Sequence, residues 1–387
     1  MKSLGCKFPV LLLLIALVGC GGGGEFENRD ANQGDGDQEP LDGDGDGEVP
    51  WHCSPVAADE EGNPFENLSD YCFFRGPLKA QEPNEGVVRY DVTAPLYSDK
   101  SEKLRFIVLP EGEKIDFSLQ GHWGWPDETV IVKTFYYPVD QRDPTLGRQI
   151  LETRLLIKEE GKWKAESYLW NEEQTEARRF NLGRRIPVEF TNDAGERVEI
   201  DYRMPNRNQC RTCHGQGGDL KPLGPRTYQL TNPYGGALDE LPQLEKFEEL
   251  GMFTEALPDY SARRPVVNYF DTSYPLKERA RSYLDANCAH CHGASGRAAS
   301  SNLHLGIDIE DPRKIGICKF PVAAGGGAGG LTYDIVPGHP EESIMIYRME
   351  TTNLAIKMPE LPLTTNDAFG IDLISEWIRQ MDPPGCP

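Results

Sequence analysis

The sequence predicts a multidomain protein in which a β-rich N-terminal domain, either a sandwich or a barrel, is followed by an all-α domain. Two observations predict this fold class. Runs of β-branched and aromatic residues at 104–109, 129–137 and 154–157 are bounded by Pro, Gly and charged residues, as β-strands are. After residue 215 such runs give way to apolar residues at helical spacing, first before Cys288 and then near the C-terminus.

The remaining elements follow in chain order. Residues 187–190 and 198–202 flank a segment of Asn, Asp and Gly, which predicts a hairpin. Residues 241–250 predict a short helix that ends at a glycine. Residues 275–287 and 371–381 predict two amphipathic helices that frame the α-domain. The predicted boundaries are 51–215 for the β-rich domain, 216–274 for a connecting region and 275–387 for the α-domain.

The N-terminus predicts a targeting segment. Lys2 and Lys7 flank the start of an apolar stretch at 10–18, which is shorter than the roughly 20 residues that span a bilayer. The segment ends in Leu-Val-Gly-Cys20, which resembles the lipobox of bacterial lipoproteins. The resemblance implies a signal peptide at 1–19 and an acylated Cys20 that anchors the protein to a membrane.

Residues 20–50 predict an acidic Gly/Asp-rich tether, because so few apolar side chains cannot bury enough surface to fold. Gly21, rather than Asp, follows Cys20; by the sorting rule of such lipoproteins this implies the outer membrane of a cell envelope. Residues 42–47 are similar to the front half of a calcium loop. The twelfth position falls on Cys53 instead of Glu, however, so the bidentate ligand is missing.

The charge balance bears on possible partners. The formal net charge is −22, from 62 acidic and 40 basic residues. This balance argues against nucleic acid, whose binding depends on neutralising phosphates with Lys and Arg. It favours a partner with a basic docking face, because opposite charges steer encounter.

Two motifs carry the chemistry: Cys210-Arg-Thr-Cys213-His214 and Cys288-Ala-His-Cys291-His292. With ten Cys and seven His, chance yields about 0.005 Cys-x-x-Cys-His matches in a chain of this composition. Cysteines at i and i+3 share one face of a helical turn, where both thiols can add to the two vinyl groups of a haem. The following His is then placed to ligate iron. The motifs therefore predict two covalently bound haems c.

Zinc and dithiol chemistry are the alternatives. A Cys₄ zinc site usually has its second cysteine pair 15–20 residues after the first, whereas Cys213 and Cys288 are 75 positions apart. A dithiol redox motif gives no reason for a His after both second cysteines. Haem therefore remains the favoured cofactor.

The second motif is followed by Met358-Pro359, just ahead of the terminal helix. The order of helix, Cys-x-x-Cys-His and Met resembles class I cytochrome c domains. The resemblance implies a cytochrome c-like α-domain in which His292 and Met358 ligate the iron, a ligand pair that suits electron transfer. Met345 and Met349 lie in an apolar stretch and are expected in the core.

Wider stretches strengthen the interpretation: 208–210, 223–226, 280–284, 287–293, 333–338 and 340–343. Together they resemble a family of bacterial diheme c-type cytochromes with a β-rich N-terminal region, and the similarity runs from about Tyr71 to Met381. The sequence as a whole predicts electron transfer, with the two haems as consecutive relay centres that exchange electrons with other redox proteins.

The sequence does not identify the sixth ligand of the first haem, because no Met-Pro follows Cys213 within the β-rich domain or the connecting region. The candidate ligands are His122, Met204 and Met252. The segment Trp125–Lys133 also weakly resembles β-type cytochromes c′ and their lysine-cross-linked relatives, whose haem is five-coordinate. We nevertheless expect Lys133 to be an ordinary strand lysine.

An open first haem is the basis of the alternative function, a haem enzyme or small-ligand-binding protein acting on peroxide or nitrogen oxides. A site walled by Val132, Phe135 and similar residues would be dry and apolar. We therefore expect it to admit small neutral ligands and to exclude ions.

Four further cysteines, Cys53, Cys72, Cys318 and Cys386, follow Cys20 in the chain. Export permits disulfides. Of the three possible pairings, proximity in sequence favours Cys53–Cys72, which leaves Cys318–Cys386. Free thiols are the alternative.

Acylation at Cys20 makes a first prediction. The protein should partition with membranes and be released by detergent rather than by salt, because acyl chains insert into the bilayer. Cys20→Ser should leave the protein soluble outside the cytoplasm, whereas Cys6→Ser, a change within the signal peptide, should not alter partitioning. Recovery of the unaltered protein wholly in the soluble fraction would count against the anchor.

Overall fold

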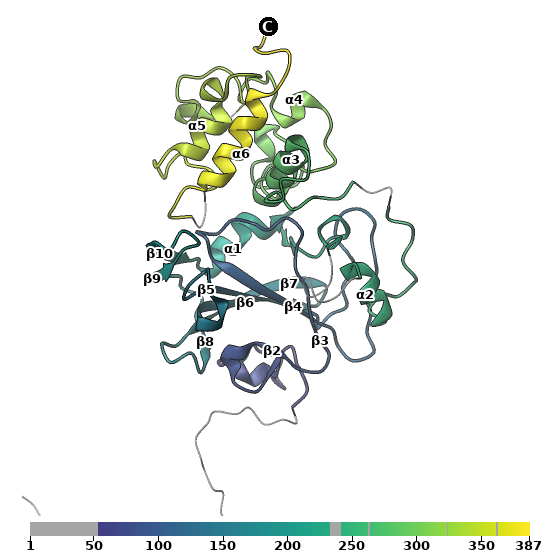
Figure 1. Cartoon of the computed structure of the whole chain (residues 1–387). Helices are drawn as coiled ribbons and strands as arrows, with labels where there is room; N and C mark the ends of the chain where they lie inside the picture. Colours follow the sequence, from purple (N-terminus) through teal and green to yellow (C-terminus); the bar gives the residue numbers. More distant parts are fainter. Residues whose placement is uncertain (1–52, 233–240, 262–263, 323, 361–362) are drawn as a thin grey trace, which may run out of the picture. The chain divides into compact units, whose positions relative to one another are not determined.

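A six-stranded antiparallel sheet forms the centre of the structure (Figure 1). Each strand pairs with the next one in the chain, so the sheet is a meander with β3 and β8 at its edges. The computed structural model describes residues 53–232, 241–261, 264–322, 324–360 and 363–387. The strands are β3 (Val87–Arg89), β4 (Glu102–Val108), β5 (Val130–Pro138), β6 (Arg148–Glu159), β7 (Lys162–Trp170) and β8 (Ala177–Arg179).

The predicted strand runs at 104–109, 129–137 and 154–157 lie in β4, β5 and β6, which confirms those strands. Side chains along each strand alternate between the two faces of the sheet. Val132 therefore faces the opposite side from Lys133. Between β6 and β7 the chain turns at Glu160 and Gly161, both of which have positive φ, as a two-residue hairpin requires.

The two faces of the sheet bury different parts of the chain. Phe106, Val132 and Leu155 lie on one face and share a core with the N-terminal segment 68–78. The other face, with Ile131, shares a core with the segment that follows the first motif. The elements of the first segment are η1 (Ser69–Tyr71), β1 (Phe74–Arg75), η2 (Leu78–Ala80) and β2 (Glu82–Pro83). Those of the second are β11 (Gly215–Gln216), β12 (Asp219–Leu220), η4 (Thr227–Gln229) and α2 (Gln243–Glu249).

The predicted hairpin is also present and leads into the first motif. β9 (Arg184–Thr191) pairs with β10 (Arg197–Met204), and Phe190 and Tyr202 pack on Tyr137 of β5. The helix predicted at 241–250 is α2, a few residues shorter. A 3₁₀ turn, η3 (Pro144–Leu146), connects β5 to β6.

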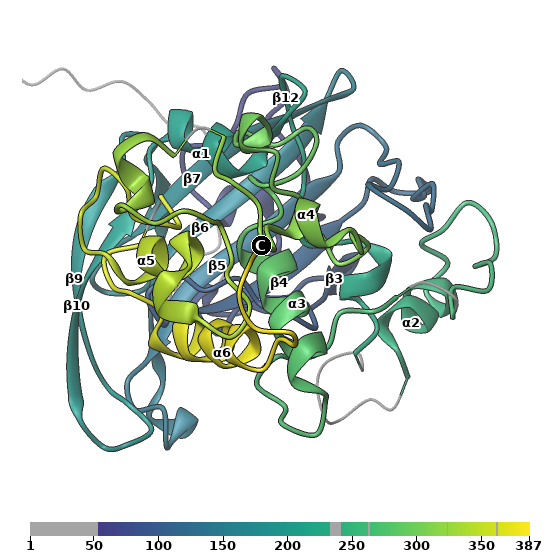
Figure 2. The same ribbon diagram turned by 90° about the horizontal axis from the view of Figure 1, so that it is seen from above.

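The C-terminal region contains both predicted amphipathic helices, α3 and α6, which pack against each other. Gly370 of α6 sits directly on Tyr283 of α3, since a Cβ on Gly370 would lie 2.1 Å from the Tyr283 hydroxyl oxygen. Seen from above, α3, α5 and α6 lie over the central strands (Figure 2). The elements are α3 (Leu276–Asn287), η5 (Ala299–Ser301), α4 (Pro312–Ile315), η6 (Gly325–Ala328), η7 (Pro340–Glu342), α5 (Ile344–Glu350) and α6 (Ala368–Arg379).

The prediction of an all-α cytochrome c-like domain at the C-terminus is wrong. The described chain is sheet-rich and has only six α-helices. Between α3 and α6 the chain runs mostly through turns and isolated β-bridges, such as Ile317 with Ile335 and Tyr333 with Ser343. The physical reason is composition: the region between the two amphipathic helices is rich in Gly and Pro, which are poor helix formers.

All the described residues belong to one compact unit, so the helical and sheet-bearing parts are packed together. The predicted signal peptide 1–19, the acylated Cys20 and the tether 20–50 lie outside the described residues. Within the described part of the chain, no helix has the length and apolar character that crossing a membrane requires.

Asp99 joins the sheet-bearing part to the C-terminal region. Its side chain is buried, and its carboxylate accepts hydrogen bonds of 2.8–3.0 Å from the backbone N–H and the hydroxyl of both Thr364 and Thr365. Nearby, the Tyr97 backbone N–H donates to the Asn287 side chain at 2.7 Å. These contacts hold the loop that follows Met358 against the connection between β3 and β4.

Removal of the Asp99 carboxylate should therefore destabilise the protein. Asp99→Ala leaves four donors without their acceptor, and we expect the free energy of unfolding to fall by about 3 kcal/mol. Asp193→Ala, at an exposed hairpin turn, serves as the control and should change it by about 0.5 kcal/mol or less. Urea unfolding measures both. Equal effects of the two substitutions would show that the Asp99 contacts contribute no special stability.

Candidate functional site

The first motif lies on α1 (Arg207–His214), which begins directly after β10. Asn206 caps the helix: its side chain accepts a hydrogen bond from the Gln209 backbone N–H at 3.0 Å, and the Gln209 side chain accepts one from the Asn206 backbone N–H at 2.9 Å. These reciprocal hydrogen bonds form a capping box, which fixes the start of the helix. Cys210 and Cys213 consequently share one helical face, as the spacing predicts.

The second motif follows α3 in a further helical turn. The backbone N–H groups of Cys291 and His292 donate to the Cys288 carbonyl oxygen at 3.1 and 2.8 Å. The chain then folds back at Gly296, where a Cβ would lie 2.3 Å from the Cys291 carbonyl oxygen. The structure thus also brings these three residues of the second motif together.

Both motif histidines are held through Nδ1. The His214 Nδ1 contacts the Lys221 carbonyl oxygen at 2.8 Å, so it carries the proton and donates. The His292 Nδ1 lies 3.1 Å from the Ser301 hydroxyl oxygen, which itself donates to the Ala298 carbonyl at 2.7 Å and therefore accepts from the imidazole. Nε2 of each ring is left as the ligand nitrogen, the arrangement usual for metal-binding histidines.

The two imidazoles are neutral at ordinary pH. Burial, with smaller contributions from nearby Lys133 and His290, lowers the pKa of His214 to about 4. Burial likewise lowers the pKa of His292 to about 4, with a contribution from Arg348. Metal ligation needs the unprotonated nitrogen, so both rings have the form that binds iron.

A cavity adjoins each motif. The first, of about 190 Å³, lies between α1, the end of α3 and the face of β4–β7 opposite Val132. The second, of about 230 Å³, lies beside the second motif and is lined by Leu303, Leu305, Met345, Met349 and Met358, among others. On the same measure one water occupies about 10–15 Å³. Both cavities therefore have room for a much larger ligand.

The two cavities share a wall formed by Cys213, Asn287, His290 and Pro359. The Cys291 Sγ lies 3.5 Å from the Thr212 carbonyl oxygen, so the turns of the two motifs touch. Hydrogen bonds to the Cys213 sulfur from Cys291 and His290 hold the pKa of Cys213 well below its usual value. Ligands in the two cavities would be immediate neighbours.

The structure does not bring the predicted sixth-ligand candidates into the first cavity. The His122 Nε2 instead contacts Gln216 at 3.0 Å and Arg226 at 3.1 Å. Met204 is buried under the β9–β10 hairpin, and Met252 lies in the core beside α2. None of these three candidate residues is among those that line the cavity. Met358 does line the second cavity, together with Met345 and Met349, so its role as a ligand stays a prediction.

Apolar side chains line much of the first cavity, Phe135 among them as expected, but the cavity is not the purely apolar chamber that the sequence suggested. Val132 points into the core on the far side of the sheet. Arg105, Lys133 and Arg154 line the cavity instead, on three neighbouring strands. The error has a physical cause: a strand presents alternate residues to each face, and the register between strands, which sets the neighbours, is not visible in one sequence.

His290 is a functional candidate that sequence reasoning missed. It is the variable residue before Cys291 in the second motif, yet it lines both cavities. An imidazole beside the first cavity is a possible iron ligand. Its sequence position gave no signal, because the role depends on the packing of one motif against the other.

The geometry counts against the zinc alternative. Of the described residues, only His339, Glu341 and Glu342 form a group of three or more His, Cys or acidic residues whose ligand atoms lie close enough to share a metal ion. The motif cysteines do not form such a group. They are also free thiols, whereas disulfides join Cys53 to Cys72 and Cys318 to Cys386, the two predicted pairings.

The residues present fit a covalently bound haem at each motif. Each motif provides two free thiols on one helical turn and an imidazole oriented through Nδ1. Each also borders a cavity whose walls include apolar side chains, which a macrocycle needs. Cys210, Cys213 and His214 would hold one haem, and Cys288, Cys291 and His292 the other.

Comparisons with known proteins returned no significant match to any family model, curated protein or solved structure. The interpretation of the site therefore depends on its own geometry.

Proposed function

We propose that the chain is a diheme c-type cytochrome that transfers electrons between two covalently attached haems and external redox proteins. One observation carries the proposal: two Cys-x-x-Cys-His turns contact each other, and the cavities beside them share a wall. Electron transfer weakens steeply with distance, so adjacent sites favour a relay. A bound haem supplies the one-electron couple of its iron.

The chain's own residues have distinct roles in this proposal. The motif cysteines fix each haem covalently, and Nε2 of His214 and of His292 ligates iron. The Lys221 carbonyl and the Ser301 hydroxyl hold the two imidazole rings in place. Met358 would complete the second site, because it lines the cavity beside His292. Asp99 fastens the loop that follows Met358 to the sheet-bearing part.

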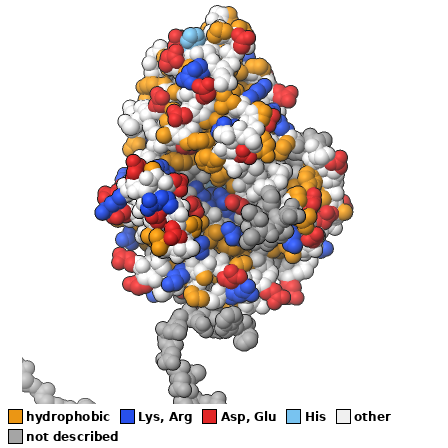
Figure 3. Space-filling view, in the orientation of Figure 1, with side chains coloured by type: hydrophobic (Ala, Val, Ile, Leu, Met, Phe, Trp, Pro, Cys, Tyr) orange, Lys and Arg blue, Asp and Glu red, His pale blue; other side chains and the backbone are white. Residues whose placement is uncertain are grey.

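The setting of this activity is also a proposal. We place the protein in the cell envelope, held by acylated Cys20 at the outer membrane. The net charge of −22 supports transient redox partners with a basic docking face and no nucleic acid. The face in Figure 3 carries acidic and basic side chains interspersed, so the acidic character is distributed rather than confined to one patch there.

A second candidate is a haem enzyme or small-ligand-binding protein that acts at the first haem. The observation that favours it is the position of His122, Met204 and Met252, none of which lines the first cavity. Ligand binding at iron needs an open coordination position. Carbon monoxide binding by one haem of the reduced protein would favour this candidate over a relay that binds no ligand.

Covalent attachment at both motifs predicts the mass of two haems on the denatured protein, because thioether bonds survive unfolding. Cys210→Ala with Cys213→Ala should remove one haem and leave the other, and Cys288→Ala with Cys291→Ala should do the converse. Mass spectrometry and a pyridine haemochrome assay measure the content. Bound zinc without haem would contradict the proposal.

Ligation by Met358 predicts a change at one haem only. Thioether sulfur favours ferrous iron, so Met358→His should lower the reduction potential of the second haem and abolish the weak sulfur-to-iron band at the red end of the oxidised spectrum. Met345→Leu and Met349→Leu are the matched controls, because both residues line the same cavity. Loss of the band in either control, with its persistence in Met358→His, would assign the ligand elsewhere.

A further inference from the structure

Three basic residues form a row across one face of the central sheet. In the strand register Arg105 of β4 lies opposite Lys133 of β5, and Lys133 lies opposite Arg154 of β6. All three side chains line the first cavity. Directly opposed residues have Cβ atoms about 4.5–5.5 Å apart, and like charges there are destabilising. We call this row the cation ladder.

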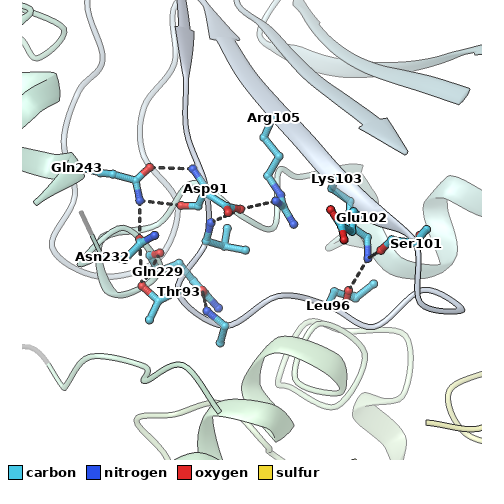
Figure 4. Close-up of polar contacts among 12 residues, drawn as sticks. Asp91, Thr93, Leu96, Ser101, Glu102, Lys103, Arg105, Gln229, Asn232 and Gln243 are labelled. Carbon is cyan, nitrogen blue, oxygen red and sulfur yellow. Dashed lines mark hydrogen bonds and ion pairs between the residues drawn. The ribbon is translucent and has the colours of Figure 1, made fainter. Parts of the chain in front are cut away.

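The two outer members of the cation ladder have counter-charges. Arg105 pairs with Asp91 at 2.5 Å, and the Gln243 amide holds the Asp91 backbone in turn (Figure 4). Arg154 makes two hydrogen bonds to the buried Glu152 carboxylate, at 2.5 and 2.8 Å. Their charges are therefore satisfied within the protein.

The middle member of the cation ladder is different. Among the described residues no carboxylate pairs with Lys133, whose Nζ lies 4.9 Å from the centre of the Phe135 ring. Burial lowers the pKa of Lys133 well below its usual value, and Arg105, Lys103 and Arg154 lower it further. Lys103 is itself satisfied, since its Nζ donates to the carbonyl oxygens of Leu96 and Ser101 (Figure 4).

The acidic groups of the cavity lining do not compensate for Lys133. Glu166 is engaged by Arg207 at 3.1 Å and by the Asn181 amide at 2.6 Å. Asp285 accepts the Ile307 backbone N–H at 2.8 Å, and burial raises its pKa to about 6. The cavity thus presents one amine that has no counter-charge among the described residues. A bound anion would supply that charge and favour the protonated form of Lys133.

We propose that the first cavity binds a small anion at Lys133, beside the haem attached to Cys210 and Cys213. The inference rests on the proposed function and refines its second candidate. It also reverses the expectation that the site excludes ions. Lys133 would donate to the anion, while Arg105 and Arg154, held by their own carboxylates, add positive potential on both sides.

A carboxylate of a haem propionate could also supply the negative charge that pairs with Lys133. The propionates, however, lie on the edge of a haem opposite its two attachment points. Lys133 and Arg154 line the same cavity as the attachment residues Cys210 and Cys213. The titration of Lys133→Met distinguishes a free anion from a propionate.

The test is a ligand titration of the holoprotein at constant ionic strength. Nitrite and azide are added to the oxidised protein, and carbon monoxide to the reduced protein, while the spectrum of the first haem is followed. We expect Lys133→Met to weaken binding of both anions about tenfold or more, the loss expected for a charged hydrogen bond. Carbon monoxide, which is neutral, should bind equally well to both proteins.

Two further variants control for charge and for folding. Lys133→Arg should retain anion binding to within about threefold, because it keeps the positive charge. Lys164→Met removes an exposed lysine of β7 and should change nothing. Lys133→Met should melt at or above the temperature of the unaltered protein, because it relieves repulsion within the cation ladder.

Several outcomes would overturn the inference. Unchanged anion affinity in Lys133→Met would do so, and so would a holoprotein with two haems that binds neither anion, although the proposed function would then stand. A shifted potential of the first haem in Lys133→Met, with anion affinity unchanged, would assign Lys133 to a propionate. Absence of haem would instead refute the proposed function itself.

Discussion

The contact between the two Cys-x-x-Cys-His turns is the interaction on which the arrangement of the site depends. Cys291 touches the backbone of Thr212, and His290 borders both cavities. Both turns are needed to enclose the first cavity. The helix α1, which carries the first turn, forms one wall, the end of α3, which leads into the second turn, forms another, and the sheet forms a third. The Asp99 carboxylate, buried and without a salt-bridge partner among the described residues, secures this arrangement by binding the loop beyond Met358.

Local patterns predicted the local features of this structure. The strands β4 to β6 follow from runs of β-branched and aromatic residues, and the helices α3 and α6 follow from helical spacing. The motif residues follow from their own spacing. The C-terminal region differed, because two amphipathic helices say nothing about the Gly- and Pro-rich chain between them. The sixth-ligand candidates were chosen by elimination, and elimination does not identify the residues that face a cavity built from strands, helices and loops far apart in the sequence.

The two cavities have different characters, and the difference follows from the elements that build them. Apolar residues and three methionines line much of the second cavity, which suits a closed centre. The first is bounded by a sheet face on which Lys133 lies between Ile131 and Phe135 on β5, with Arg105 and Arg154 opposite it on the adjacent strands. Register placed Arg105, Lys133 and Arg154 side by side, so its electrostatics belong to the sheet as a whole and not to any one strand.

The Cys318–Cys386 disulfide has a topological consequence for the second cavity. The bond closes a covalent ring whose two cysteines are separated by 68 positions in sequence. All three methionines of the cavity wall lie inside that ring. A single backbone cut anywhere within the ring would leave both fragments tethered to each other. Proteolytic cleavage at one site within the ring would therefore not release the segment that carries these three methionines.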